Sequence, residues 1–200
     1  MNKYKSYKAF NEAKTKCTLC SLSNERKQVV CSDGCKKPVI MVVGEAPGAD
    51  EDEQGVPFIG KAGKRLRSTL ENFGITKKNS IITNVIPCRP PKNAFPKDKE
   101  LVANCFHSWL WNEIRLTKPK YLLLLGNQPL KMILNLNGIT KHRGILYPLY
   151  DPNGGVTFWA MPTFHPSYIE RKQYMEDGEQ IIEWFEEDIK KLAGVAGIDN

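Results

Sequence analysis

Residues 39–48 read Val-Ile-Met-Val-Val-Gly-Glu-Ala-Pro-Gly, five apolar residues followed at once by a turn. Three further apolar runs, each short and bounded by turn residues, occur at Ile81–Ile86, Tyr121–Leu125 and Val156–Met161. None of the runs alternates between apolar and polar residues, which is typical of strands buried on both faces of a parallel sheet. We therefore expect four parallel strands, with Val39–Val43 as the first.

Helical spacing of apolar residues fills the intervals between these runs. We expect one helix to stop at Gly74, one to start near Asp98, and one to follow Gly126 with Pro129 in its first turn. Apolar residues between positions 182 and 192 indicate a C-terminal helix. Strands that alternate with helices predict a three-layer α/β/α fold around a central four-stranded, mainly parallel sheet.

The composition is that of an ordinary globular protein. The chain has 200 residues, of which 41% are apolar and 26% are charged, and this excludes wholesale disorder. The length suits a single domain over residues 1–200. The longest aliphatic run, Leu122–Leu125, is too short to cross a bilayer, and the N-terminus lacks the apolar stretch of a secretory signal. We therefore expect a cytoplasmic protein with no membrane segment.

The net charge of +7 points weakly to nucleic acid. The segments directly after the predicted strands are more informative, because ligands of α/β sheets bind outside the carboxyl ends of the strands. The chain there reads Gly44–Gly48, Asn84–Cys88, Gly126-Asn127 and Thr163–Ser167. These segments hold most of the unusual polar residues, so we expect the functional site at this edge of the sheet.

Cysteine spacing suggests a metal site more than disulfides in an intracellular chain. The six cysteines are Cys17, Cys20, Cys31, Cys35, Cys88 and Cys105. The first two form a Cys-x-x-Cys hook. The next two could complete a small zinc site, or the last two could complete a four-thiolate site for an iron–sulfur cluster. Spacing alone slightly favours zinc, and any single cysteine could simply be a buried apolar residue.

Four segments carry a family resemblance. They are GEAPGADEDEQGVPFIGKAGKRL (44–66), TNVIPCRPPKN (83–93), LLLGNQP (123–129) and PTFHPSYIERK (162–172). Together they closely resemble the family 4 uracil-DNA glycosylases, the iron–sulfur branch of that superfamily. The resemblance runs from about Cys17 to the C-terminal helix. Any one motif is weak evidence, but four in order with consistent spacing are highly specific.

The resemblance implies a 4Fe–4S cluster that staples the N-terminal segment to the domain. Its implied ligands are Cys17, Cys20, Cys88 and Cys105. This replaces the local zinc hypothesis and leaves the remaining two cysteines outside the family pattern. We expect them to be buried rather than to form a second, adventitious metal or redox pair.

The implied activity is to flip uracil out of DNA and hydrolyse its N-glycosidic bond, which leaves an abasic site. Asn84 would read uracil against cytosine, and Phe58 would stack on the base. His165 and the backbone N–H of Ala46 would donate hydrogen bonds to uracil O2. Glu51 would crowd uracil C5 and exclude the methyl group of thymine.

The sequence does not decide which group directs the attacking water. The best-known uracil glycosylases have an aspartate where this chain has Ala46, so the group is Glu45 or is absent, with DNA phosphates stabilising the sugar cation. The remaining implied contacts are to DNA. Phosphates would be held by Gly60, Lys61, Gly63, Gly126, Asn127 and Ser167; Tyr168 and Ile169 would enter the gap in the stack; and Arg171 would grip the backbone.

Two alternative functions remain. One is a glycosylase of the same fold for another base, such as a 5-substituted uracil or hypoxanthine. The other is a non-catalytic DNA-binding or redox module, against which the presence of both Asn84 and His165 argues. A Rossmann-type nucleotide enzyme is excluded because no G-x-G-x-x-G follows the first strand. The expected partner is uracil-containing DNA, bound by a monomer.

Overall fold

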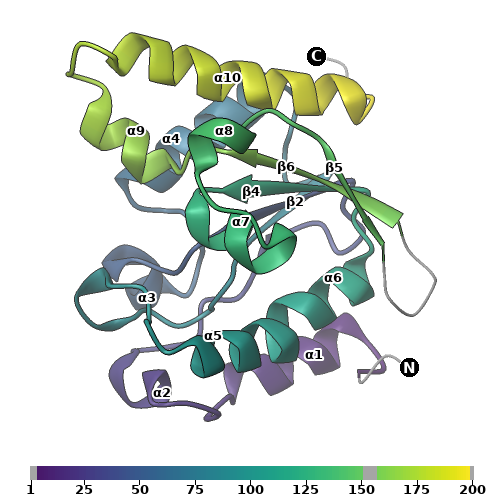
Figure 1. The fold of residues 1–200 in the computed structure, drawn as a ribbon. Coiled ribbons are helices and arrows are strands. Elements are labelled where there is room, and N and C mark those ends of the chain that lie inside the picture. The colour runs from purple at the N-terminus through teal and green to yellow at the C-terminus, as the bar shows by residue number, and fades with distance from the viewer. Residues whose placement is uncertain (1–3, 151–156, 199–200) are drawn as a thin grey trace.

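The computed structural model describes residues 4–150 and 157–198. Within these ranges the strands form one six-stranded sheet in the order β1-β3-β2-β4-β6-β5 (Figure 1). They are β1 (Asp33–Gly34), β2 (Ile40–Gly44), β3 (Ser80–Asn84), β4 (Tyr121–Leu125), β5 (Tyr147–Tyr150) and β6 (Thr157–Thr163).

The four central strands are parallel and correspond to the four predicted apolar runs, so the predicted fold class is confirmed. The first residue of the fourth run, Val156, lies outside the described residues. The sheet is wider than predicted because β1 and β5 pair antiparallel at its two edges. β1 has only two residues, and β5 contains Pro148 and is half exposed, so neither edge strand resembles a buried apolar run.

The helices that the apolar spacing predicted are present. In the described residues the α-helices are α1 (Tyr7–Thr15), α2 (Leu22–Glu25), α3 (Ala49–Gln54), α4 (Lys61–Asn72), α5 (Lys99–Cys105), α6 (Trp111–Thr117), α7 (Asn127–Leu134), α8 (Ile139–His142), α9 (Pro166–Lys172) and α10 (Gly178–Val195). A 3₁₀ turn, η1 (Pro91–Asn93), precedes α5, and a π-helical turn, η2 (Phe106–Leu110), joins α5 to α6. Gly74 follows α4 with φ 71°, and Asp98 caps α5 by accepting from two backbone N–H groups.

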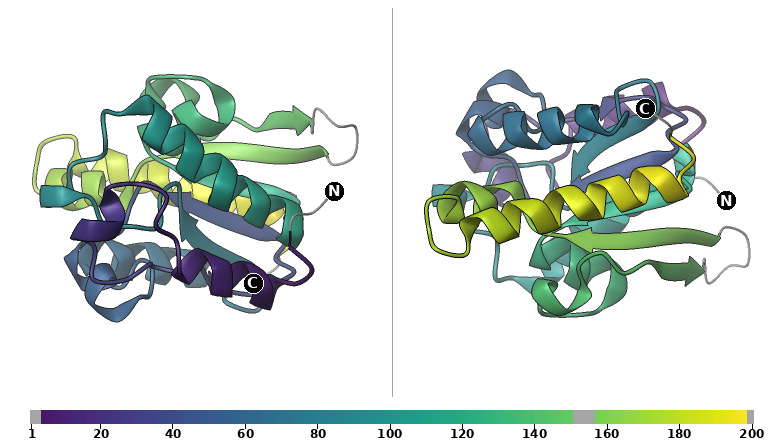
Figure 2. Two further views of the ribbon diagram at one scale, coloured as in Figure 1. Left: turned by 90° about the horizontal axis from the view of Figure 1, so that it is seen from below. Right: turned by 90° about the horizontal axis from the view of Figure 1, so that it is seen from above.

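Two helical layers cover the sheet (Figure 2). The layer of α1, α5 and α6 packs on one face, against strand residues such as Met41 and Val43. The layer of α4, α9 and α10 packs on the other face, against Ile40 and Val42. Successive residues of β2 thus enter opposite cores, which explains why its run is continuously apolar. No helix of the described ranges combines the length and apolar character needed to span a membrane.

A buried ion pair ties α1 to α6. The Lys14 ammonium lies 3.0 Å from Glu113 Oε2, and the two side chains are only 1% and 0% exposed. The hydroxyl of Tyr7 donates to Glu113 Oε1 over 2.6 Å. Ser32, which accepts from Lys14 over 3.4 Å, extends the network to Thr83 on β3. The N-terminal helix is therefore fixed to the domain by buried polar contacts as well as by apolar packing.

The register of the sheet brings the predicted motifs together. Gly44 pairs with Asn84 across β2 and β3. At the ends of β4 and β6, the N–H of Gly126 donates to the carbonyl of Thr163 over 2.9 Å. All four central strands therefore end at the same edge of the sheet, where α3, α7 and α9 begin (Figure 1).

Candidate functional site

A pocket of about 790 Å³ lies at the carboxyl ends of the central strands. All the predicted non-cysteine site residues except Ile169 line it: Glu45, Ala46, Glu51, Phe58, Gly60, Lys61, Gly63, Asn84, Gly126, Asn127, His165, Ser167, Tyr168 and Arg171. They come from segments more than 100 residues apart in the chain, and the parallel strands bring them together.

Asn84 and Phe58 form the inner wall of the pocket above Gly44. A Cβ atom at Gly44 would lie 2.3 Å from the Phe58 ring and 2.5 Å from Asn84 Oδ1, so only glycine leaves room for both side chains. Asn84 is 6% exposed, and within the described residues its buried Oδ1 has no hydrogen-bond partner. A buried polar atom without a partner is rare in native proteins, and here it lines a pocket that a ligand could enter.

The backbone of Phe58 has φ 55°, in the left-handed region that favours glycine. Arg67 holds this conformation, because its Nε donates to the Phe58 carbonyl over 2.9 Å and its Nη2 to the Pro57 carbonyl over 2.7 Å. Gly63 allows the close approach of α4, since a Cβ there would lie 2.1 Å from the Phe58 carbonyl carbon. The fold therefore holds the ring in place in a strained conformation.

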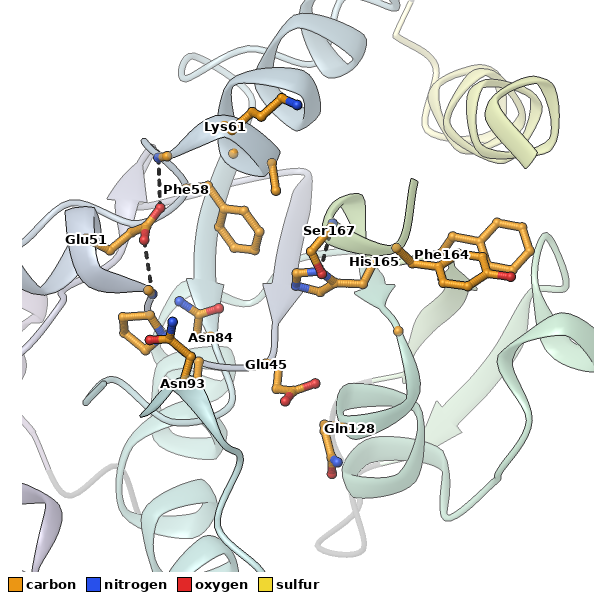
Figure 3. Close-up of a pocket in the computed structure, with 18 of the residues that line it drawn as sticks. Glu45, Glu51, Phe58, Lys61, Asn84, Asn93, Gln128, Phe164, His165 and Ser167 are labelled. Carbon is orange, nitrogen blue, oxygen red and sulfur yellow. Dashed lines mark hydrogen bonds between the residues drawn. The ribbon is translucent and has the colours of Figure 1, made fainter. Parts of the chain in front are cut away.

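His165 stands opposite Phe58, with 6.0 Å between the ring centroids. Its Nδ1 lies 3.2 Å from the N–H of Ser167, which donates to it, and 2.8 Å from the Ser167 hydroxyl. Burial and then the positive charge of Arg171 lower the pKa of His165 to about 4, so the ring is neutral at pH 7. Because Nδ1 accepts a hydrogen bond, the proton of the neutral ring is on Nε2. The Phe58 ring, the His165 imidazole and the Asn84 amide converge on one space (Figure 3).

Gly126 shapes the opposite wall beside His165. It has φ 85°, and a Cβ atom there would lie 3.0 Å from His165 Cβ, so a side chain would be both strained and crowded. The next residue, Asn127, begins α7, and its Oδ1 accepts from the N–H of Ile139 over 3.0 Å. The first backbone N–H groups of α7, which the helix itself cannot pair, therefore lie at the pocket edge.

Glu51 connects two loops of the pocket. One carboxylate oxygen accepts from the N–H of Gly48 over 3.0 Å, and the other accepts from Ile59 and Gly60 over 2.9 Å each (Figure 3). Charge-assisted hydrogen bonds of this kind are among the strongest in proteins. The family resemblance implied only a steric role for Glu51 against C5, and this bracing of the pocket wall was missed.

Glu45 follows β2 directly and lines the same pocket. Burial raises the pKa of its carboxyl group, and the positive charge of Arg171 partly offsets this effect. At the opposite rim, Lys61 begins α4 and forms a 2.8 Å ion pair with Glu170 of α9. The predicted phosphate-binding turn therefore carries a lysine that already has a carboxylate partner.

One predicted site residue is misplaced. Ile169 is 0% exposed and packs in the core with α4 and α10, so the prediction that it enters the DNA stack is wrong. The cause is the helical spacing of α9, which turns Pro166 and Ile169 inward together. Tyr168 remains at the pocket, half buried, with its ring 5.4 Å from that of Phe164.

Several pocket residues were missed, among them two amide side chains that lie in quoted motifs. Gln128 follows Asn127 at the start of α7, and Asn93 lies in η1 with φ 56° (Figure 3). Asn93 Oδ1 accepts from Arg89 Nε over 2.8 Å. An asparagine in a Pro-rich loop is the only sequence signal that could have indicated such a left-handed turn.

The four cysteines of the predicted cluster lie together. Three of them, Cys17, Cys88 and Cys105, are buried in one hydrophobic core, and Cys20 packs against the same core. Burial raises the pKa of the Cys88 and Cys105 thiols, and the nearby Cys17 and Cys20 raise both pKa values further. In the described residues no three metal-binding side chains are close enough to share a single ion. Four neighbouring cysteines match the number of thiolate ligands that a 4Fe–4S cluster takes.

Cys31 and Cys35 are half-buried, so the prediction that both are buried is wrong, and Cys31 packs against the same core as the group. Burial raises the pKa of Cys31, whose charged neighbours are Lys14 and Glu113. Cys35 accepts a hydrogen bond from the N–H of Lys37 over 3.4 Å.

Comparison with known proteins adds an independent observation. A family model described as "Uracil DNA glycosylase superfamily" matches residues 31–189. The chain is 39% identical over 168 residues to a type-4 uracil-DNA glycosylase of Thermotoga maritima, covering 83% of this chain and 84% of the relative. It is 35% identical over 191 residues to that of Pyrobaculum aerophilum (92% and 90%) and 36% identical over 198 residues to that of Sulfurisphaera tokodaii (96% and 85%).

Proposed function

The chain belongs to the uracil DNA glycosylase superfamily, and on that basis we propose that it excises uracil from DNA as its type-4 relatives are named for doing. One observation carries the proposal. Three groups face one slot that suits a flat base with polar edges: the fixed ring of Phe58, the neutral imidazole of His165, and Asn84 Oδ1, which is unpaired in the part of the chain that the structure describes.

Asn84 gives the slot its preference for uracil. Its Oδ1 accepts from uracil N3–H, and its Nδ2 donates to O4. Cytosine presents an acceptor at N3 and a donor at the neighbouring amino group, so it would leave the buried amide with two mismatched contacts. The base must leave the helical stack to reach this slot, and Phe58 replaces the lost stacking with its own ring.

His165 supplies the stabilisation of the leaving group. As the bond between N1 of uracil and C1′ of the sugar breaks, negative charge collects on O2 of the base. The Nε2–H of the neutral ring donates to that oxygen without transferring its proton, and the N–H of Ala46 donates beside it. Glu45, which also lines the pocket, orients the water that attacks C1′ and takes up its proton.

The pocket rim holds the DNA backbone. The N-terminal turns of α4 and α7, at Gly60 to Gly63 and at Gly126 to Asn127, present backbone N–H groups to phosphates. Ser167 and Arg171 add side-chain contacts near the extruded nucleotide, and Tyr168 faces the gap that the base leaves. The pocket is complete within one chain, so we propose that a single domain acts as a monomer.

The four grouped cysteines would hold a 4Fe–4S cluster as thiolates. Bound there, the cluster would supply a cross-link between the N-terminal segment, the turn after β3 and α5, and no step of the hydrolysis requires electron transfer. Purified protein should therefore contain four iron and four sulfide per chain. Stoichiometric zinc on Cys31 and Cys35 instead would refute this assignment.

The direct test uses oligonucleotides with one central uracil, thymine, hypoxanthine or 5-substituted uracil. After incubation in chelator, alkali should cleave only the uracil strand, and no nick should appear before alkali. Borohydride should trap no covalent adduct, because no lysine acts as a Schiff-base nucleophile in this mechanism. Release of another base at a higher rate would assign a different specificity to the same fold.

A further inference from the structure

Arg26 directs its guanidinium at the grouped cysteines. It follows α2, and its Nη1 donates to Cys88 Sγ over 3.1 Å. Its Nη2 donates to the backbone carbonyl of Cys17. One side chain thus bridges the N-terminal Cys-x-x-Cys hook and the turn after β3, two of the segments that the proposed cluster would join.

The electrostatic setting of Arg26 is unusual for this chain. Three other partly buried arginines each face a carboxylate: Arg65 with Glu170, Arg67 with Asp33 and Arg143 with Asp188. In the described part of the chain, Arg26 forms no such ion pair, and its partners are a thiol and a carbonyl. Hydrogen bonds to two neutral acceptors offset little of the free energy that a guanidinium loses when it is removed from water. Thiolates at the same place would balance its positive charge.

The backbone around Arg26 is held firmly in place. The N–H groups of Lys27 and Gln28 donate to the carboxylate of Asp52, which is 2% exposed on α3, over 3.0 Å and 3.4 Å. A few residues on, the N–H of Val30 donates to the Pro87 carbonyl over 2.8 Å, directly before Cys88. The side chain therefore starts from a fixed position, and little freedom is lost when it reaches the sulfur.

We propose that Arg26 is a positioning residue of the iron–sulfur cluster, donating to the Cys88 thiolate and offsetting part of the negative charge of the four thiolates. This inference rests on the cofactor assignment above. Hydrogen bonds to the ligand sulfurs and the net charge around a cluster set its reduction potential. The positive charge of Arg26 favours the reduced cluster, which carries one more electron, and the fork to Cys88 and Cys17 slows loss of the cluster.

The test compares wild type with Arg26→Gln, Arg26→Lys and the control Lys27→Gln, all purified without oxygen. Lys27 is the neighbouring cation, but its side chain is 64% exposed and pairs with Glu53 on the surface. Iron and sulfide content, midpoint potential by redox titration, and the rate of bleaching in air with chelator are measured for each. Arg26→Gln should have a more negative potential and bleach several-fold faster. Arg26→Lys should retain most of the potential but bleach faster, and Lys27→Gln should match wild type.

Each outcome decides the inference. Wild-type potential and bleaching rate in Arg26→Gln would overturn it and leave the proposed function intact, because uracil release is assayed separately. A wild-type protein without iron would overturn both the inference and the cofactor assignment. If the glutamine variant does not fold, the lysine variant decides. Equal bleaching rates for Arg26→Lys and wild type would show that the paired hydrogen bonds of the guanidinium to Cys88 and Cys17 do not retain the cluster.

Discussion

The surroundings of His165 set its protonation state and so prepare it to donate a hydrogen bond to the leaving base. The N–H of Ser167 fixes the tautomer, and burial keeps the ring neutral. His165→Ala should lower kcat by roughly two to three orders of magnitude, about 3–4 kcal/mol, as for loss of an oxyanion donor. Affinity for uracil-containing DNA should change little, because phosphates dominate positioning. Single-turnover kinetics with separate binding titrations check this.

Two further variants sharpen the test of His165. Ser167→Ala keeps the backbone donor and should cost much less than His165→Ala. Asn84→Ala should lose discrimination between uracil and cytosine as well as rate, and its loss should be non-additive with that of His165 because both side chains act on one ring. A His165→Ala enzyme with weakened binding but unchanged chemistry would contradict the proposed role.

Glu45 should determine how the rate depends on pH. Its pKa is raised by burial, so as pH falls the carboxylate is protonated earlier than an exposed glutamate and the excision rate falls with it. His165 stays neutral down to about pH 4 and does not cause this acid limb. Glu45→Gln should slow excision and flatten the limb in a pH series of single-turnover rates. An unchanged limb would mean that another group directs the water.

Variants of Glu51 distinguish steric exclusion of the thymine methyl group from hydrogen bonding that holds the pocket wall. Glu51→Gln keeps the size of the side chain but replaces one acceptor oxygen with a donor, so at least one N–H among Gly48, Ile59 and Gly60 loses its partner. We expect kcat/KM on uracil to fall roughly tenfold, since a hydrogen bond to a charged group contributes about 1.5–3 kcal/mol. Thymine should still be rejected. Full activity in Glu51→Gln with thymine release in Glu51→Ala would show that bulk alone matters.

Among the elements, α1 depends on the Lys14–Glu113 pair. Lys14→Met leaves Glu113 as a buried charge without its cation, and the loss should be about 3–5 kcal/mol in the free energy of unfolding. Urea titration of protein with equal iron content measures it, and adding Glu113→Gln should restore part of the loss. Lys8→Met, at the exposed pair with Glu12, should change stability by less than about 0.5 kcal/mol.

The sequence predicts those strands and helices that show a regular pattern of apolar residues. β2, β3, β4 and β6 follow from apolar runs, and the position of the site follows from the polar residues at their ends. It does not predict β1, which is too short for a pattern, or the inward turn of Ile169, which depends on how α9 packs. The contact of Arg26 with Cys88 joins residues 62 positions apart, so no local pattern records it. The contacts of Glu51 with Ile59 and Gly60 depend on how the loop after α3 folds back, which no periodicity indicates.

For the whole molecule, the net charge of +7 should show in its binding to DNA. The logarithm of affinity should fall linearly with the logarithm of salt concentration, with a slope of about −0.9 for each phosphate contact on duplex DNA. Arg171→Gln should reduce the slope by about one. Asn84→Ala, which touches only the base, should leave it unchanged. Fluorescence anisotropy between 50 and 200 mM salt, the range over which such contacts lose most affinity, checks both expectations.

The left-handed backbone of Phe58 implies a trade-off between stability and function. Such a conformation costs about 1–3 kcal/mol in a residue other than glycine, and Arg67 and Gly63 maintain it whether or not DNA is present. The cost is thus met once, during folding, and an incoming base finds its stacking partner already ordered. The strain lowers the stability of the free protein. Because the loop is already ordered, however, base binding is neither slowed nor weakened by ordering of the loop.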